Sequence, residues 1–243
     1  MKKRGSHVGI TLSFVIFIVF VGFLYIIFEP SMNIKQDKEL ALEYLEKELI
    51  ESSTAELTTV SILFNMSSLN DTIFNSETDL CLEIKSPENF GELFTYAIVK
   101  NEEENLIASK KEENNLNFNF TNQSFLKIYY SSELVEEALL TETADCVFIN
   151  KTNYSIGHIQ KKEYIFKSKI LALIGDYYTI SPNIKNLINS EFDFGFTDSE
   201  GPPPTWTNEI KNVSTSVYAK EIPIQYIDEE ANIKSGYLNI RIW

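Results

Sequence analysis

The sequence opens with MKKRGSHVGITLSFVIFIVFVGFLYIIFEP (residues 1–30), in which a short basic stretch leads into an unbroken apolar run. Residues 8–28 carry no charge. As an α-helix they span about 32 Å, which matches the hydrocarbon core of a bilayer. A cleaved secretory signal has a shorter apolar region and a cleavage site between small residues, and this stretch has neither. The sequence therefore predicts a transmembrane helix over residues 8–28, behind a basic leader of residues 1–7.

Charge is distributed unevenly along the chain. Three basic residues and no acidic one precede the apolar run, whereas Glu29 and Asp37 follow it. The positive-inside rule then places the N-terminus in the cytoplasm and residues 29–243 on the extracytoplasmic side of the cell membrane. The net charge is −14 for the whole chain and +3 for residues 1–28, so the remainder carries −17. Such an acidic body repels phosphates, which argues against nucleic acid as a partner.

The start of the chain resembles the leader of type IV prepilins, and especially archaeal class III signal peptides, because KKRG is followed at once by SHVGITLSFVIFIVF. Only residues 1–30 carry this resemblance. It implies that a peptidase cuts between Gly5 and Ser6, and that the surviving helix forms the packing core of a filament or secretion assembly. Residues 6–10 lack both the glutamate of bacterial pilins and the Gln-x-Ser-like start of archaeal ones. An uncleaved single-pass signal-anchor is the alternative.

Residues 29–53 are expected to form a second, amphipathic helix. Pro30 interrupts the apolar helix where it leaves the bilayer, and helical periodicity then resumes. Four apolar residues fall on one face of this helix, namely Ala41, Leu42, Leu45 and Leu49. This shape fits the stem of a pilin, and it fits equally a stalk whose apolar face packs on the sheet of its own domain.

Residues 54–243 are expected to form one extracytoplasmic β-rich domain. Strict alternation of apolar and polar residues indicates half-buried antiparallel strands. The alternating stretches are NLNFNFT (115–121), FDFGFT (192–197) and SGYLNIRIW (235–243). Residues 222–227 and 238–242 are predicted to pair as a hairpin, with Pro223 pointing to a nearby sheet edge.

One or two helical insertions are expected among these strands. SSELVEEALL (131–140) has helical spacing, and SPNIKNLINSEF (181–192) offers Ser181 as an N-cap with Pro182 in the first turn. YIFKSKILALIGDYY (164–178) is compatible with a strand or with a buried helix. The predicted fold class is therefore α+β, with a transmembrane helix, a short amphipathic helix and a mostly antiparallel β domain.

No catalytic motif is found. The nucleophile elbow, the phosphate-binding loop, HExxH and GxGxxG are all missing, so we expect a non-enzymatic protein without cofactor or metal. Asp193, Asp198 and Glu200 could offer oxygen ligands to Ca²⁺, although DSEG is also an ordinary turn sequence. His158 stands alone between apolar neighbours, which is typical of a structural or surface residue.

The two cysteines, Cys81 and Cys146, are too few for a metal knuckle and too far apart for a CxxC redox site. In an exterior compartment they could form one disulfide that closes a long loop. Alternation in DLCLEIK (79–85) places Cys81 on the polar face of a strand, which is an unusual position for a cysteine that only fills a core. Pairing and free thiols both remain open at this point.

Acceptor sequences for N-glycosylation (Asn-x-Ser/Thr) occur seven times, against about three expected by chance from the composition. They lie at Asn65, Asn70, Asn119, Asn122, Asn150, Asn153 and Asn212. All seven fall on the predicted outer side, where glycans would coat an exposed surface.

The function favoured by the sequence is that of a single-pass membrane-anchored surface or structural protein, in particular a pilin-like subunit. Its partners would be the membrane and other helices, because residues 8–28 can form homo- or hetero-oligomers in which Gly9 and Gly22 permit close approach. The alternative is an anchored extracytoplasmic domain that binds a ligand, a glycan or another protein. A deep pocket or an exposed aromatic patch would favour this alternative.

Overall fold

The structure is a computed structural model that describes residues 6–67, 69, 80–86, 96–112, 114–120, 123–134, 146–199, 201, 205–207 and 216–243, leaving aside the side chains of residues 6–8 and 28–34. It confirms the α+β class, with a long N-terminal helix followed by mostly antiparallel sheets and further helices. The helices are α1 (Ser6–Ser53), α4 (Lys167–Gly175) and α5 (Tyr177–Ile188). The strands are β1 (Thr54–Phe64), β2 (Leu80–Lys85), β3 (Tyr96–Lys100), β4 (Leu106–Ile107), β5 (Ser109–Glu112), β6 (Asn115–Phe120), β7 (Phe125–Ser131), β8 (Val147–Phe148), β9 (Tyr154–Phe166), β10 (Phe192–Asp198), β11 (Thr205–Trp206), β12 (Tyr218–Ile227) and β13 (Ile233–Ile242).

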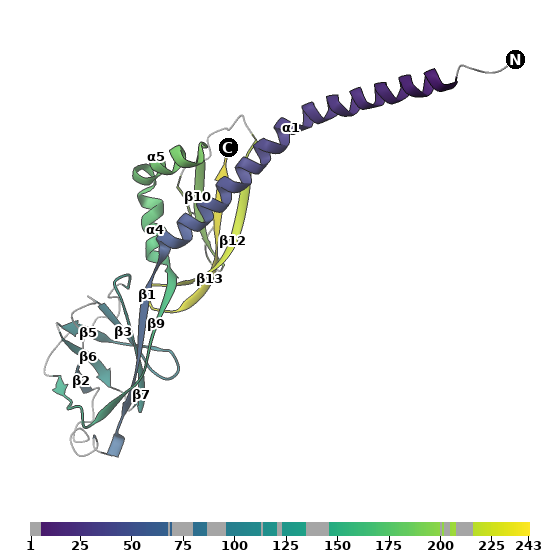
Figure 1. Cartoon of the computed structure of the whole chain (residues 1–243). Helices are drawn as coiled ribbons and strands as arrows, with labels where there is room; N and C mark the ends of the chain where they lie inside the picture. The colour runs from purple at the N-terminus through teal and green to yellow at the C-terminus, as the bar shows by residue number, and fades with distance from the viewer. Residues whose placement is uncertain are drawn as a thin grey trace.

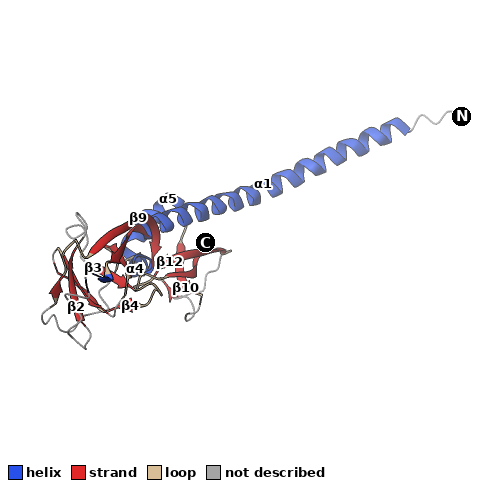
Figure 2. Cartoon of the chain, turned by 90° about the horizontal axis from the view of Figure 1, so that it is seen from below, coloured by secondary structure: helices blue, strands red, loops and turns tan. Residues whose placement is uncertain are grey.

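The chain folds into an extended molecule in which α1 projects from a strand-rich body (Figure 1; Figure 2). The body has two lobes, and the long strands β1 and β9 run from one to the other. We call residues 54–166 the sandwich lobe. We call the second half of α1 together with residues 167–243 the helix lobe. Each lobe has its own buried apolar core, and a smaller apolar cluster lies where the two meet.

α1 is a single helix of 48 residues. The expected interruption at Pro30 is wrong, because Pro30 lies within α1 and the two predicted helices are one element. Proline removes one backbone hydrogen bond and crowds the preceding turn, so it often bends a helix without ending it. Figure 1 shows α1 changing direction about midway along its length.

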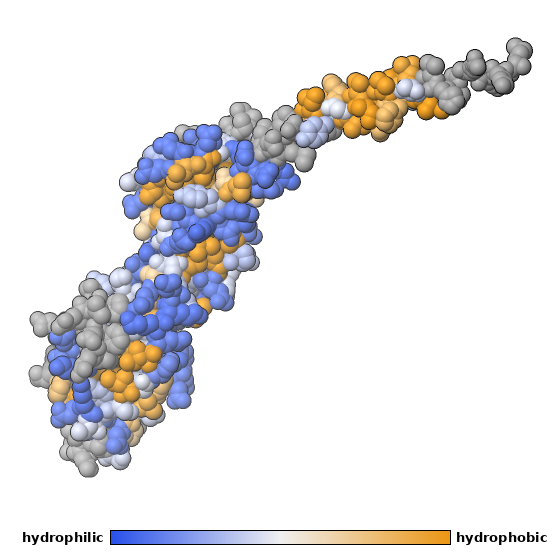
Figure 3. All heavy atoms as spheres, viewed as in Figure 1, coloured by the Kyte–Doolittle hydropathy of each residue, from blue (hydrophilic) through white to orange (hydrophobic). Residues whose placement is uncertain are grey.

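The first half of α1 is apolar and exposed on all sides. Residues Gly9–Ile27 have a mean hydropathy of 2.8 over 19 residues, and none of this stretch is buried in the protein (Figure 3). The segment is therefore long enough and apolar enough to cross a membrane.

The second half of α1 forms part of the core of the helix lobe. Leu45 and Leu49 are completely or almost completely buried against a layer of aromatic and branched residues from β10, β12 and β13. Polar contacts flank this apolar contact: Lys220 of β12 pairs with Glu46, and Lys38 Nζ donates a hydrogen bond to Ser190 Oγ over 2.7 Å. Of the two roles that the sequence left open for this amphipathic face, the structure shows packing on the sheet of its own domain.

The larger sheet has the strand order β11-β10-β13-β12-β9-β1-β7-β3-β4. The predicted hairpin is confirmed, since β12 and β13 pair antiparallel with Ile222 opposite Leu238. β9 pairs with β12 only at Tyr226 and Ile227, in parallel, so the pairing stops before it reaches Pro223. Here the sheet turns from one lobe into the other.

The sandwich lobe packs a second sheet, β5-β6-β2-β8, against β1, β7 and β3 of the first. Alternation in β6 works as expected, because Leu116, Phe118 and Phe120 are all buried in the core between the sheets. In the predicted helix over residues 131–140, Leu134 is buried and residues 135–140 lie outside the described residues.

The ambiguous stretch 164–178 contains the end of β9, all of α4 and the start of α5. The prediction that the next helix begins at Ser181 is wrong. α5 begins at Tyr177, and Pro182 lies inside it. The start is fixed by Tyr177, which is buried and whose hydroxyl donates a hydrogen bond to the Phe192 carbonyl oxygen over 2.5 Å. This contact with β10 outweighs the local preference of Pro182 for a first turn.

We expect that Leu45→Ala will lower the free energy of unfolding of the helix lobe by about 2–4 kcal/mol, because it empties a fully buried site. Leu40→Ala is the matched control on the same helix, since Leu40 is 57% exposed and should lose less than about 1 kcal/mol. Urea unfolding of the full chain in detergent, followed by tryptophan fluorescence, measures both. Equal losses of unfolding free energy in the two variants would contradict the burial of this face of α1 in the core of the helix lobe.

Candidate ligand-binding groove

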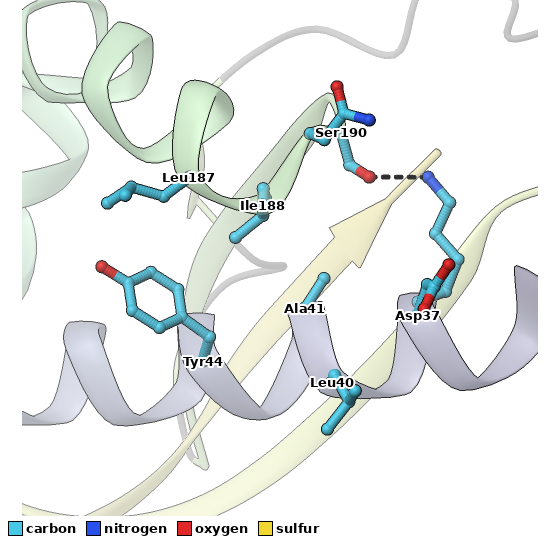
Figure 4. Close-up of a pocket in the computed structure, with 9 residues that line it drawn as sticks. Asp37, Leu40, Ala41, Tyr44, Leu187, Ile188 and Ser190 are labelled. Carbon is cyan, nitrogen blue, oxygen red and sulfur yellow. Dashed lines mark hydrogen bonds between the residues drawn. The ribbon is translucent and has the colours of Figure 1, made fainter.

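The described surface includes two hollows large enough for a small ligand. The first, of about 590 Å³, lies between α1 and α5 (Figure 4). Figure 4 shows Leu40, Ala41, Tyr44, Leu187 and Ile188 around it, with the Lys38–Ser190 hydrogen bond across one end. Its lining combines apolar side chains with polar groups, and two of the polar side chains, those of Lys38 and Ser190, bond to each other.

The second hollow, of about 520 Å³, lies between the lobes, and we call it the interlobe groove. Its floor is one face of the sheet, formed by β1, β3, β7 and β9. Register places the floor residues side by side: Thr59 lies opposite both Tyr129 and Gln160, and Ser61 lies opposite Lys127. Its wall is the turn between β12 and β13, where Ile227, Ala231, Asn232 and Ile233 border the groove.

The wall is held to the floor by apolar packing and by one buried lysine. Leu57 and Ile98 of the floor pack with Ile227 and Ala231 of the wall. Lys100 at the end of β3 is only 1% exposed, and its Nζ donates a hydrogen bond to Asn232 Oδ1 over 2.6 Å. Burial lowers the pKa of Lys100, although nearby carboxylates oppose this effect. Lys100 therefore connects β3 of the sandwich lobe to the turn between β12 and β13 of the helix lobe.

The carboxylate of Asp228 fixes the shape of the wall. One of its oxygens accepts hydrogen bonds from the backbone N–H groups of Glu230 (3.0 Å) and Asn232 (2.8 Å). The other accepts from Lys234 Nζ over 3.1 Å. Burial alone would raise the pKa of Asp228, but these hydrogen bonds outweigh it and hold the pKa below its usual range. The turn is thus a rigid, preformed edge of the groove.

A second charged cluster lies at the β3–β7 end of the groove. Glu104 has a left-handed backbone (φ 63°), which brings its side chain to Lys127 and to the Tyr129 hydroxyl, a donor at 2.9 Å. Burial opposes ionisation of Glu104, but these two donors outweigh it and lower its pKa. Burial and the hydrogen bond to Glu104 raise the pKa of Tyr129. At neutral pH this corner therefore holds the carboxylate of Glu104 and the neutral phenol of Tyr129 beside Lys127.

The remaining floor offers polar groups that have no partner of their own. Within the described part of the chain, the side chains of Thr59, Ser61, His158 and Gln160 make no hydrogen bond or ion pair. They combine hydroxyl, amide and imidazole groups on two adjacent strands. A concave surface with a few such convergent groups is the usual form of a ligand site.

Sequence reasoning missed this groove, and it singled out His158 only as a lone residue. His158 lies where β9 carries a bulge, since Val60 pairs with Ile159 while Ile62 pairs with Ile156. The bulge leaves the exposed imidazole on the floor of the groove. Polar residues at alternate positions of TAELTTVSILF (54–64) were the available signal, but nothing in the sequence indicated which segment covers them.

The structure joins Cys81 of β2 and Cys146, just before β8, in a disulfide with a Cα–Cα distance of 4.6 Å. It closes a loop within the sandwich lobe, remote from the groove. The proposed calcium ligands do not converge: Asp193 and Asp198 point to opposite faces of β10, and Glu200 lies outside the described residues. No group of three or more His, Cys, Asp or Glu side chains among the described residues could hold a metal ion.

The residues of the predicted processing site lie at the start of α1. Ser6 is its first residue, and Gly5 lies outside the described residues. Cleavage of the bond between them stays a prediction.

Three of the seven glycosylation acceptors meet at the tip of the sandwich lobe. The Asn65 N–H donates a hydrogen bond to the Asn153 carbonyl over 2.8 Å, and the Asn153 N–H donates to the Asn150 carbonyl over 2.9 Å. This tip is the end of the body farthest from the N-terminus (Figure 1). Asn119 lies on β6, and Asn70, Asn122 and Asn212 lie outside the described residues.

We expect glycans at this tip, because Asn65 and Asn150 are exposed at the ends of strands. Glycopeptide mass spectrometry of protein from native membranes should find masses above that of the bare polypeptide at these positions. Thr152→Ala should remove modification at Asn150 while leaving Asn65 modified, since it destroys only one acceptor sequence. Unmodified peptides covering Asn65, Asn150 and Asn153 would refute the prediction.

Comparison with known proteins found no match. No protein family, no curated protein and no solved structure is detectably similar to this chain. What the protein does must therefore be inferred from its own residues and geometry.

Proposed function

We propose that this protein is a single-pass membrane-anchored structural subunit, pilin-like in organisation, whose N-terminal helix assembles with the helices of neighbouring subunits. One observation carries the proposal. α1 is a continuous helix whose first half is apolar and unburied, while its second half is built into the core of the helix lobe. Because both parts belong to one helix, the orientation of the body is coupled to the orientation of the segment that would cross the membrane.

The exposed half of α1 needs an apolar environment. Gly9–Ile27 presents apolar side chains around its whole circumference, so lipid, other helices or both must cover it. Gly9 and Gly22 leave open space beside the helix, because a Cβ at either position would meet no atom within 4 Å. Small residues of this kind let a second helix approach closely in a bilayer.

The charge pattern supports an exterior location for the body. The basic residues all precede the apolar segment, whereas residues 29–243 carry a net charge of −17 by difference. The positive-inside rule then assigns the N-terminus to the cytoplasm. The acidic body, with its disulfide, suits an oxidising extracytoplasmic compartment.

A second candidate function is recognition of a ligand by the exterior body, and the interlobe groove favours it. The groove is preformed, since the Asp228 turn and Lys100 hold its wall in place. Its unpaired polar floor has no evident structural role. Assembly through α1 and binding in the groove use different parts of the molecule and are compatible.

Gly22→Leu should weaken self-association of the full chain in native membranes, because it fills the space that a neighbouring helix would occupy. We expect the association constant to fall about fivefold or more. Val21→Leu is the control, since Val21 already carries a side chain. Crosslinking of membranes measures the oligomer fraction, and its finding only monomers for the wild-type chain would refute assembly.

The intact mass of the protein from the same preparation shows whether the bond between Gly5 and Ser6 is cleaved. A chain beginning at Ser6 supports prepilin-like processing, and one beginning at Met1 leaves an uncleaved anchor.

A further inference from the structure

Lys100 is a buried amine with few partners. An ammonium can donate three hydrogen bonds, but among the described residues Lys100 Nζ has one acceptor, the Asn232 side chain, and no ion pair. A buried cation without an ion pair is costly, so burial favours the neutral amine and lowers the pKa of Lys100. Nearby carboxylates oppose this effect only in part. The neutral amine of a desolvated lysine is a nucleophile.

The side-chain amide of Asn232 presents its carbonyl group to this amine. The hydrogen bond from Lys100 Nζ to Asn232 Oδ1 is 2.6 Å long. Because a C=O bond measures about 1.23 Å, Nζ lies at most about 3.8 Å from the amide carbon, Cγ. Two atoms that react with each other are well placed at about 3–3.5 Å. The amine therefore needs little movement to reach this carbon.

Two carboxylates hold the other end of the same amide. Asn232 Nδ2 donates hydrogen bonds to Asp228 Oδ2 and to Glu230 Oε2, each over 3.1 Å. Turning the amide over would set its NH2 group against the Lys100 amine and its oxygen against both carboxylates, so these contacts fix its orientation. The backbone supports the arrangement, because Ala231 is left-handed (φ 58°) and the Asp228 N–H donates to the Asn232 carbonyl oxygen over 3.1 Å. The nitrogen that faces the carboxylates is the one that leaves if the amine attacks Cγ.

We propose that Lys100 and Asn232 form an isopeptide bond once the chain has folded, with Asp228 relaying a proton. The neutral amine attacks Cγ, the Nζ–Cγ bond forms and the Cγ–Nδ2 bond breaks. One proton moves from Nζ to Nδ2, which leaves as ammonia, so the reaction needs no other reactant. When Nζ is bonded to Cγ, both nitrogens share that carbon. The buried Asp228 carboxylate beside Nδ2 can then take the proton from one nitrogen and give it to the other.

This bond joins the two lobes at a second place. The backbone already connects them through β1 and β9, which pair with each other (Figure 1). Lys100 and Asn232 lie 132 residues apart in the sequence and belong to different lobes. A covalent link between them fixes the wall of the interlobe groove to its floor. The modification concerns the body alone, so it depends neither on assembly through α1 nor on ligand binding in the groove.

The test is a tryptic peptide map, by mass spectrometry, of the full chain purified in detergent. Trypsin cannot cut after a linked Lys100, so we expect one branched peptide in which residues 86–110 are joined to residues 221–234. Its mass should be that of the two peptides together less one ammonia, and its fragmentation should locate the link at Lys100 and Asn232. Neither peptide contains an N-glycosylation acceptor sequence or any part of residues 1–7. Glycans and processing at the N-terminus therefore leave this measurement unchanged.

Lys100→Arg and Asn232→Ala should each abolish the branched peptide, because a guanidinium stays protonated and alanine has no amide to attack. Lys161→Arg is the matched control, since Lys161 is exposed and pairs with Glu56, and this variant should keep the branched peptide in full. Asp228→Asn keeps the size of the side chain but removes the proton acceptor. It should lower the linked fraction about tenfold or more at the same time after synthesis.

Separate peptides from the wild-type chain, one of them ending at Lys100, would overturn the proposal whether or not the variants fold. So would a loss of ammonia confined to the peptide of residues 221–234, which is the sign of a cyclic imide at Asn232. Full linkage in the Asp228→Asn chain would overturn the proton relay. None of these outcomes bears on crosslinking through α1, so the two proposals fail separately.

Discussion

The structure depends on the burial of one helical face, that of the second half of α1, in the core of the helix lobe. Leu45 and Leu49 are buried among aromatic residues of β10 and β12 and aliphatic residues of β13, while the same helix continues unbroken into an apolar segment that is not buried in the protein. A separate stalk would let the body rotate freely relative to the apolar segment. Because the helix is part of the core, the orientation of the body is coupled to that of the apolar segment.

The second constraint is the way the sandwich lobe is inserted between α1 and α4. β1 leaves the helix lobe and β9 returns to it, so two adjacent strands carry the connection. Where the sheet passes from one lobe to the other, β12 and β9 share only two residue pairs. This short pairing creates the interlobe groove. The core of the sandwich lobe stabilises one side of the junction, and Lys100 with the Asp228 turn fixes the other.

Local patterns predicted much of this fold. The apolar segment, the buried face of α1, the buried alternation of β6 and the β12–β13 hairpin all follow from periodicity, because each depends on residues close in sequence. The errors arose where tertiary contacts outweigh local preference: α1 continues through Pro30, and the contact between Tyr177 and Phe192 starts α5 ahead of Pro182. The groove could not be predicted, because it forms only when residues 227–233 fold over strands more than sixty residues away.

The central claim is that α1 acts as one helix from the apolar segment to the core of the helix lobe. It is tested most directly by a pulsed electron–electron distance measurement between spin labels at Val19→Cys and Glu43→Cys in the full chain, since both native cysteines are held in the disulfide. A continuous, gently bent helix predicts a narrow distribution centred near about 35 Å. A broad distribution with a large population at clearly shorter distances would show that the helix is broken at Pro30, and would contradict the coupling of the apolar segment and the body.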